Sequence, residues 1–279
     1  FLAGLRGYFV EHAYGNTTLA DLLRALEPSS GRELGDWSKL WLETAGINTL
    51  TPEFTLDADG NYTAFEIVQT APNADASANT CRPHSHAVAL YEDQQGQLVR
   101  TQRIELDVAG ERTAVGALVG VKQPALLLIN DDDLTYCKLR LDEHSLATLR
   151  GSAGARADEP VADTGGIARF ADALPRALCW SAAWDMTRDG ELATRDYIAL
   201  VLAGARSETD IGVMQSLNRQ ALRALEIYAD PAYAPEGYAA LSDNAPRALR
   251  SAEPGSDHQL AWLHALVGGA RGVEQTAFV

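Results

Sequence analysis

Apolar residues near the start of the chain recur at the three- and four-residue spacing of amphipathic helices. This spacing predicts a helix over 1–14, a second beginning at Thr18, and a third from about Asp36 to Gly46. Thr18 suits a helix start because its hydroxyl can accept a backbone N–H at the third helical position. These short helices form a unit that is small for an independent domain.

After Pro52 the pattern changes to alternation, which predicts β-strands. Turn-forming residues such as Asp59-Gly60-Asn61 recur every eight to twelve residues between the strand segments. This spacing favours a small antiparallel sandwich of about seven strands. Besides the stretch described next, the expected strands are 53–57, 62–69, 86–91, 98–106 and 113–119.

The β-pattern ends in the stretch 125–142, which reads ALLLINDDDLTYCKLRLD. Its apolar half, 125–129, is followed by the turn-forming residues 130–133 and then by the alternating segment 134–141. Asn and Asp tolerate turn geometry because their side chains bond their own backbone. The stretch therefore predicts a hairpin whose second strand is half buried.

Downstream the pattern is helical. Residues 150–166 are rich in Gly, Ala, Ser and acids and show no period, which is typical of a flexible connector. Amphipathic helices are predicted over 167–188, 193–202, 208–228, 238–253 and 258–268. Paired helices of this kind resemble the start of an α-solenoid.

The predicted fold class is therefore α+β with several segments. We expect a short helical unit first, then an antiparallel β-sandwich, a linker, and a solenoid-like α-helical domain. Their boundaries are 1–50, 51–150, 151–166 and 167–279.

Composition excludes some functions and suggests a compartment. A net charge of −15 argues against nucleic-acid binding, which needs clustered Lys and Arg. No apolar run approaches the ~20 residues of a membrane span, so no membrane partner is expected. The three cysteines are odd in number and far apart, which favours reduced thiols and a cytoplasmic location.

Because the sequence starts inside an apolar helical pattern without Met, we also expect a piece of a longer polypeptide.

Two clusters could bind metal. Cys81, His84 and His86 place possible zinc ligands within six residues, but a tetrahedral site usually needs a fourth ligand from a second cluster, and none exists. Surface histidines at a strand edge are the stronger interpretation. The acids 131–133 lack the alternate spacing, glycine and distal Glu of an EF-hand loop, so a solvated hairpin turn is expected.

Other candidates for chemistry are also weak. His258 and His264 lie six residues apart, not the four that place two ligands on one helix face. Asp185, Arg188 and Asp189 are expected to form a charge cluster at a helix end. Neither H-E-x-x-H, G-x-S-x-G, a P-loop nor G-x-G-x-x-G occurs. We therefore predict no catalytic, substrate-binding or metal-binding residue in this chain.

The order of segments nevertheless resembles one enzyme family, and several motifs carry that resemblance. The segment 12–18 followed by Asp21-Leu22 is similar to the H-x-[YF]-x-N-[TA]-T-x-x-D-L segment of zinc aminopeptidases of the aminopeptidase N type, where it ends the thermolysin-like catalytic domain. The resemblance continues through the helical segment that leads into the β-sandwich, the β-stretch and the start of the helical domain, and Tyr228 to Pro231 resembles the actinobacterial branch. The residues that carry these later matches are Trp37, Trp41, Pro52, Leu128 to Asn130, Tyr136, Arg140 to Asp142, Pro175 to Ala177, Trp184 and Asp185.

The resemblance implies a role without chemistry for this chain. The family holds zinc with H-E-x-x-H and a downstream Glu, and it binds the substrate amino terminus through a G-x-M-E-N loop, all upstream of the segment matching His12. None of these is present, so zinc is expected in the parent enzyme and no cofactor here. The implied partners are the rest of the parent catalytic domain and, in the parent, peptide substrates. The expected role is a spacer and active-site-covering scaffold; the alternative is a protein-binding adaptor built from a β-sandwich and helical repeats.

Overall fold

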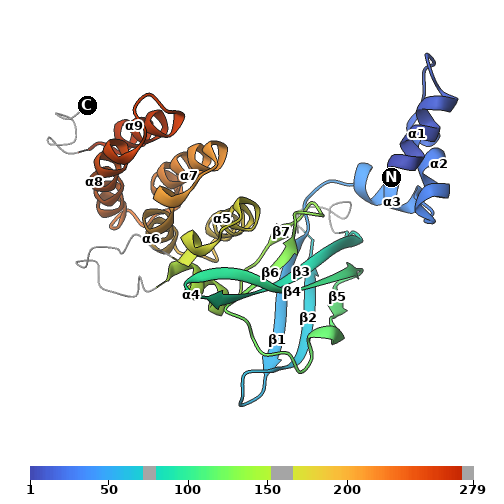
Figure 1. The fold of residues 1–279 in the computed structure, drawn as a ribbon, viewed down its shortest axis with the longest axis horizontal. Helices are drawn as coiled ribbons and strands as arrows, with labels where there is room; N and C mark the ends of the chain where they lie inside the picture. The colour runs from blue at the N-terminus through green and yellow to red at the C-terminus, as the bar shows by residue number, and fades with distance from the viewer. Residues whose placement is uncertain (72–79, 152–165, 272–279) are drawn as a thin grey trace. The chain divides into compact units, whose positions relative to one another are not determined.

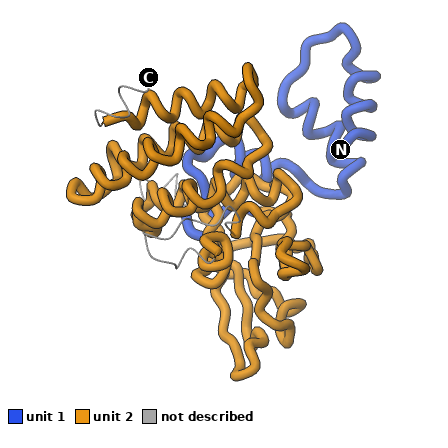
Figure 2. The backbone as a smooth tube through the Cα atoms, turned by 60° about the vertical axis from the view of Figure 1, so that its left-hand side comes forward, with its two compact units in different colours: residues 1–48, 70–83 blue, residues 49–69, 84–279 orange. Residues whose placement is uncertain are grey.

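The computed structural model describes residues 1–71, 80–151 and 166–271. The chain divides into two compact units, which Figure 2 colours separately. The first unit comprises 1–48 and 70–83, and the second comprises 49–69 and the residues from 84 onward.

The first unit contains the three helices that the sequence predicted. They are α1 (Leu2–Glu11), α2 (Leu19–Ser30) and α3 (Gly35–Leu42). The backbone N–H of Thr18 donates to Asp21 Oδ2 at 2.8 Å, so the predicted start of the second helix is confirmed. Gly4 allows α1 and α2 to touch, because a Cβ there would lie 2.9 Å from Leu26 Cδ2. None of the described apolar residues of this unit is fully buried.

A buried arginine takes the place of an apolar core in the first unit. Arg82 is only 2 % exposed. Its guanidinium donates to the carbonyls of Leu40 and Ala45, both at 2.9 Å, and lies 5.5 Å from the ring centre of Trp41. It also donates to Asn48 Oδ1 at 3.0 Å. One side chain thereby joins the end of α3 to the segment around residue 82.

The second unit begins with two β-sheets, and Figure 1 shows the strands of one crossing those of the other. The first sheet has the order β5-β2-β1-β7 and the second has the order β4-β3-β6. The strands are β1 (Thr49–Leu56), β2 (Tyr62–Thr70), β3 (His84–Gln94), β4 (Gln97–Val108), β5 (Arg112–Ala114), β6 (Leu126–Asp131) and β7 (Lys138–Leu139). Alternation thus predicted β1 to β4 to within a few residues. The expected strand 113–119 is wrong over most of its length, because β5 ends at Ala114 and a 3-10 helix, Gly116–Leu118, follows. The pairing at the end of the module also differs from the prediction.

The expected hairpin over 125–142 is wrong. β6 is buried along its whole length and pairs antiparallel with β3. β7 lies in the other sheet, where it pairs parallel with β1 through Thr49 and Lys138. The prediction of a purely antiparallel module is corrected by the same pair. The physical reason is that the continuous apolar run of β6 needs cover on both faces, which a half-exposed hairpin cannot provide.

The core of the β-module is aromatic and aliphatic. Tyr62 and Phe65 are 1 % and 2 % exposed, and their ring centres are 5.2 Å apart in an edge-to-face arrangement. Helix α4 (Glu143–Arg150), which the sequence did not predict, packs on β6. The backbone N–H of Leu127 donates to Ser145 Oγ at 2.9 Å, so a hydroxyl from α4 satisfies a buried amide of the strand.

Five helices follow in the described part after residue 166, where the sequence predicted five. They are α5 (Ala173–Arg188), α6 (Thr194–Gly204), α7 (Ile211–Arg223), α8 (Ala234–Ser251) and α9 (Asp257–Gly269), and a π-helical turn, Ala224–Tyr228, extends α7. Helix α7 packs on α5 and α9, and α6 packs on α8, so alternate helices stack on one another (Figure 1). The expected linker 151–166 lies almost wholly outside the described residues.

A buried ion pair fastens this helical region. Arg176 on α5 donates to both carboxylate oxygens of Glu208, at 2.9 and 2.8 Å, and Trp180 Nε1 donates to the same carboxylate at 3.1 Å. The side chains of Arg176 and Glu208 are 4 % and 0 % exposed. Burial raises the pKa of Glu208, but the bonds from Arg176, the Asp210 backbone and Trp180 outweigh it, so the pKa lies below its usual value.

Replacing Arg176 by Met should therefore be strongly destabilising. The change leaves a buried carboxylate without its counter-ion, which typically costs about 3–5 kcal/mol of unfolding free energy. Arg188→Met is the matched control, since it removes a half-exposed arginine from the same helix. That control should change stability by less than about 1 kcal/mol. Urea denaturation of both variants measures the difference, and equal effects would contradict this assignment.

Candidate functional site

The segment that carries the chain from one sheet to the other has an unusual backbone. We call residues 130–137 the crossover loop. Asn130, Asp132 and Asp133 have φ angles of 57°, 67° and 53°, in the left-handed region that most side chains avoid. Asn and Asp tolerate this region better than other residues. The acidic run that looked like a simple turn in the sequence is thus a folded loop with a specific conformation.

The amide of Asn130 holds the loop closed. Asn130 is only 1 % exposed. Its Nδ2 donates to the Thr135 carbonyl at 2.8 Å, and its Oδ1 accepts the Thr135 N–H at 3.0 Å. His84 then bonds the Thr135 hydroxyl through Nδ1 at 2.8 Å. Two buried side chains from neighbouring strands therefore fix the middle of the loop.

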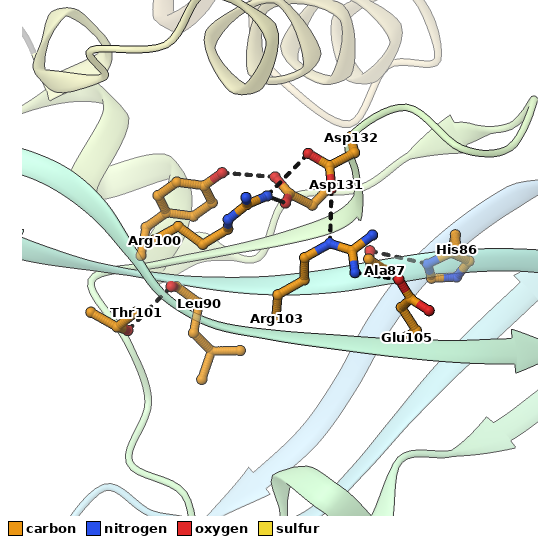
Figure 3. A network of polar contacts seen from close by, with 10 residues as sticks. His86, Ala87, Leu90, Arg100, Thr101, Arg103, Glu105, Asp131 and Asp132 are labelled. Atoms are coloured by element: carbon orange, nitrogen blue, oxygen red, sulfur yellow. Dashed lines mark hydrogen bonds and ion pairs between the residues drawn. The ribbon is translucent and has the colours of Figure 1, made fainter.

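A charged network holds the start of the loop, as Figure 3 shows. Asp131 is 1 % exposed and accepts from the Tyr91 hydroxyl at 2.7 Å and from Arg100 at 2.5 Å. Asp132 accepts from Arg100 at 3.0 Å and from Arg103 at 2.8 Å. The expectation of a solvated turn at 131–133 is therefore wrong for Asp131, which is buried against Tyr91 and Arg100. Asp132 and Asp133 are exposed, although Asp132 also pairs with arginines of β4.

The network also shifts the pKa values of Tyr91 and Asp132. Burial raises the pKa of Tyr91, and its bond to Asp131 adds to that effect. Partial burial would raise the pKa of Asp132 too, but the bonds from Arg103 and Arg100 prevail and hold it below its usual value. Both groups thus keep one protonation state near neutral pH: the phenol stays neutral and the carboxylate charged.

The remaining side chains of the loop divide into buried and exposed ones. Cys137 is largely enclosed, and burial raises the pKa of its thiol to about 12. Burial also raises the pKa of Cys179 on α5. Neither thiol is a thiolate at neutral pH, so neither is an activated nucleophile. By contrast, Leu134 is 52 % exposed and Tyr136 is 72 % exposed.

Just beyond the loop, ion pairs join the sheet to the helices. Lys138 Nζ lies 2.7 Å from Asp189 Oδ2, and Arg140 Nη2 lies 2.6 Å from the same oxygen. Arg140 Nε also lies 2.5 Å from Glu191 Oε2. The acids at the end of α5 were expected to form a helix-end cluster with Arg188. Arg188 does lie 3.8 Å from Asp185, whereas Asp189 pairs with Lys138 on β7 and with Arg140 just after it.

The two histidines that the sequence suggested as possible zinc ligands are not on the surface. His84 and His86 are 2 % and 1 % exposed, so the expected surface location is wrong. The Nδ1 of His86 lies 3.2 Å from the Ala87 carbonyl, and its Nε2 has no hydrogen-bond partner. On α9, His264 is exposed and His258 is partly buried.

Within residues 1–71, 80–151 and 166–271, no group of three or more His, Cys, Asp or Glu side chains is placed to hold a metal ion. No helix among the described residues is long and apolar enough to cross a bilayer. The absence of catalytic, substrate-binding and metal-binding residues from the whole chain stays a prediction.

Sequence reasoning found the acids of this region but missed their partners. The acidic run at 131–133 was a visible signal that cations were needed nearby. Nothing in the sequence singled out Arg100 and Arg103 among the other arginines, because their positions opposite Asp131 and Asp132 depend on strand pairing.

Comparison with known proteins gives consistent matches. The family described as the ERAP1-like C-terminal domain matches residues 126–276. An Aminopeptidase N from Streptomyces lividans is 53% identical over 279 residues, covering 99% of this chain and 31% of that protein. An Aminopeptidase N from Lactococcus lactis subsp. lactis is 37% identical over 57 residues, which is 20% of this chain and 7% of that protein. The chain thus spans about a third of the length of the Streptomyces relative.

The conformation of Asn130 leads to a test of the loop. Asn130→Gly keeps the left-handed backbone but removes both amide bonds, which should cost about 1–3 kcal/mol of unfolding free energy. Asn130→Ala should cost roughly 1 kcal/mol more, because alanine also strains the backbone at this φ. Thermal or urea unfolding of the two variants measures the contribution of the amide bonds and that of the backbone strain. A glycine variant as stable as the wild type would show that the amide bonds do not hold the loop.

Burial of His86 predicts a pH dependence. Burial lowers the pKa of His86 below its usual value of 6.5, although the Ala87 carbonyl and Asp107 oppose this. The unfolded chain therefore binds the proton more readily than the folded one. We expect neutral His86 to contribute fully to the free energy of unfolding above about pH 6.5. This contribution should be lost as the pH falls from there toward the pKa of His86 in the folded protein.

His86→Gln should remove this part of the pH profile, because glutamine does not titrate. His264→Gln is the control, since that histidine is exposed on α9. Urea midpoints measured between about pH 7.5 and pH 5 provide the comparison. Identical profiles for the wild type and His86→Gln would refute the assignment.

Proposed function

Because the chain belongs to the aminopeptidase N family and carries its ERAP1-like C-terminal domain, we propose that it is the non-catalytic central and C-terminal portion of a zinc aminopeptidase that removes N-terminal residues from peptides. The observation that carries this proposal is 53% identity along 99% of the chain to a protein of which it covers 31%. The proposed role is that of a spacer and a scaffold that covers the active site.

The residues of this chain do not fit a catalytic zinc site. H-E-x-x-H does not occur in its sequence. Among the buried histidines of β3, His84 already engages Thr135 and Gln69 through its two ring nitrogens. Within the described residues, no group of three or more possible ligands is placed around His86 to complete a metal site. In such an enzyme, zinc polarises the scissile carbonyl and lowers the pKa of a bound water. We assign both tasks to residues outside this chain.

The ion pairs next to the crossover loop support a spacer role. Arg140 is only 8 % exposed and bridges Asp189 and Glu191, so it ties the strand region to the turn between α5 and α6. Paired and partly buried charges hold one geometry better than surface pairs do. A joint of this kind would keep the helical region at a fixed position relative to the sheets.

The helices support a scaffold of stacked repeats. Alternate helices pack on one another, as in solenoids whose units contact only their neighbours. The outer face of α9 carries the exposed residues Leu260, Leu263 and Val267 at helical spacing. Terminal helices of solenoids normally have a polar outer face, so this stripe suits a further helix of the parent polypeptide. A wall of such helices would restrict access of long substrates to the active site.

The proposed partners and compartment follow the same logic. The exposed apolar residues of α1, among them Phe9 and Val10, would pack against the rest of the catalytic domain. The cysteines are free, which fits a cytoplasmic, reducing compartment. Peptide substrates would meet the assembled parent and not this chain alone.

Activity measurements test the proposal. The full-length parent protein should hydrolyse a chromogenic aminoacyl anilide at enzyme-like rates, on the order of 1–1,000 per second, and lose this activity on removal of zinc. Residues 1–279 alone should show only background hydrolysis with zinc present. Enzyme-like turnover by residues 1–279 would overturn the non-catalytic assignment. A parent without aminopeptidase activity would favour the protein-binding adaptor instead.

A further inference from the structure

The crossover loop exposes two apolar side chains from a backbone that is firmly held. Leu134 and Tyr136 are 52 % and 72 % exposed. The residue between them, Thr135, is bonded through its N–H and carbonyl to Asn130 and through its hydroxyl to His84. The two exposed side chains therefore project from a fixed point and not from a mobile tip.

This backbone conformation is costly. Three residues in the left-handed region each disfavour the folded state, and the buried groups Asn130, Asp131 and His84 are all committed to holding the loop or its start. Strained, well-supported loops of this kind are common at binding sites. The supports fix the position of Leu134 and Tyr136 before any partner arrives.

Fixed apolar and aromatic side chains make good binding anchors. Tyrosine gives a large contact area with few rotatable bonds, and it is enriched among residues that dominate interface energies. A preorganised anchor also avoids the entropy cost of ordering on binding. Beside these anchors, the exposed Asp133 adds a negative charge at the edge of the loop.

We propose that the crossover loop is a docking point that inserts Leu134 and Tyr136 into an apolar pocket on the part of the parent polypeptide outside residues 1–279. The inference rests on the proposed function. Two observations favour this occupant. The chain covers only 31% of its Streptomyces relative, so most of such a parent is available to cover the loop. A second copy is disfavoured, because each chain carries a net charge of −15 and would bring another Asp133 to the contact.

Chemical labelling of tyrosine tests the docking directly. Tyr136 should react readily with a nitrating reagent in residues 1–279, because its ring is exposed. In the full-length parent, its rate of nitration, followed by peptide mass spectrometry, should be at least tenfold lower. An equal rate in both proteins would overturn the proposal. Protection of Tyr136 in residues 1–279 that grows with protein concentration would also overturn it, by identifying a second copy as the occupant.

Variants separate docking from folding. The double change Leu134→Ser and Tyr136→Ser should leave the urea midpoint of residues 1–279 unchanged but lower that of the full-length parent. Val119→Ser is the control, since Val119 is as exposed as Leu134, at 52 %, in the same β-module but outside the loop. The control should leave both midpoints unchanged. A parent as stable with the double change as without it would contradict the docking.

Failure of this proposal is distinguishable from failure of the proposed function. A parent that cleaves aminoacyl anilides while Tyr136 stays fully reactive overturns the docking and leaves the enzyme assignment standing. A parent that protects Tyr136 without aminopeptidase activity overturns the enzyme assignment and supports the docking.

Discussion

Buried arginines paired with carboxylates or carbonyls hold the joints of this protein together. Arg82 closes the end of α3, Arg140 joins β7 to the α5 end, and Arg176 fixes α5 to the segment before α7. Removing an arginine from water is unfavourable unless each donor finds an acceptor, so each site constrains several elements at once. The planar guanidinium, with five donors, suits this task better than the single ammonium of lysine. In the second unit, the contacts of Arg140 and Arg176 therefore add to its apolar core in fixing the geometry.

Local patterns predicted the elements well because the relevant physics is local. Helical spacing identified α5 to α9, and alternation identified β1 to β4. Strand pairing could not be predicted in the same way, since the position of β7 depends on β1, which lies far away in sequence. Helix α4 was missed because its apolar residues are few and follow directly on the β-pattern.

The candidate site shows the same division between local and distant effects. The turn chemistry of Asn130 to Asp133 was visible in the sequence, but the depth of burial of Asp131 was not. Burial of His84 and His86 was also missed, because it depends on parts of the chain that are distant in sequence; His84, for example, bonds Gln69 on β2 and Thr135 in the crossover loop. The motif order that resembled zinc aminopeptidases was more informative than any single residue, and the comparisons confirmed the family.

The parallel contact between Thr49 and Lys138 has a consequence for biosynthesis. The sheet β5-β2-β1-β7 cannot be completed until both ends of the β-module have left the ribosome, because its last strand lies beside its first. At roughly 5–20 residues per second, the first strand waits for several seconds with an unpaired edge. During that time its apolar side chains are available to chaperones or to other nascent chains.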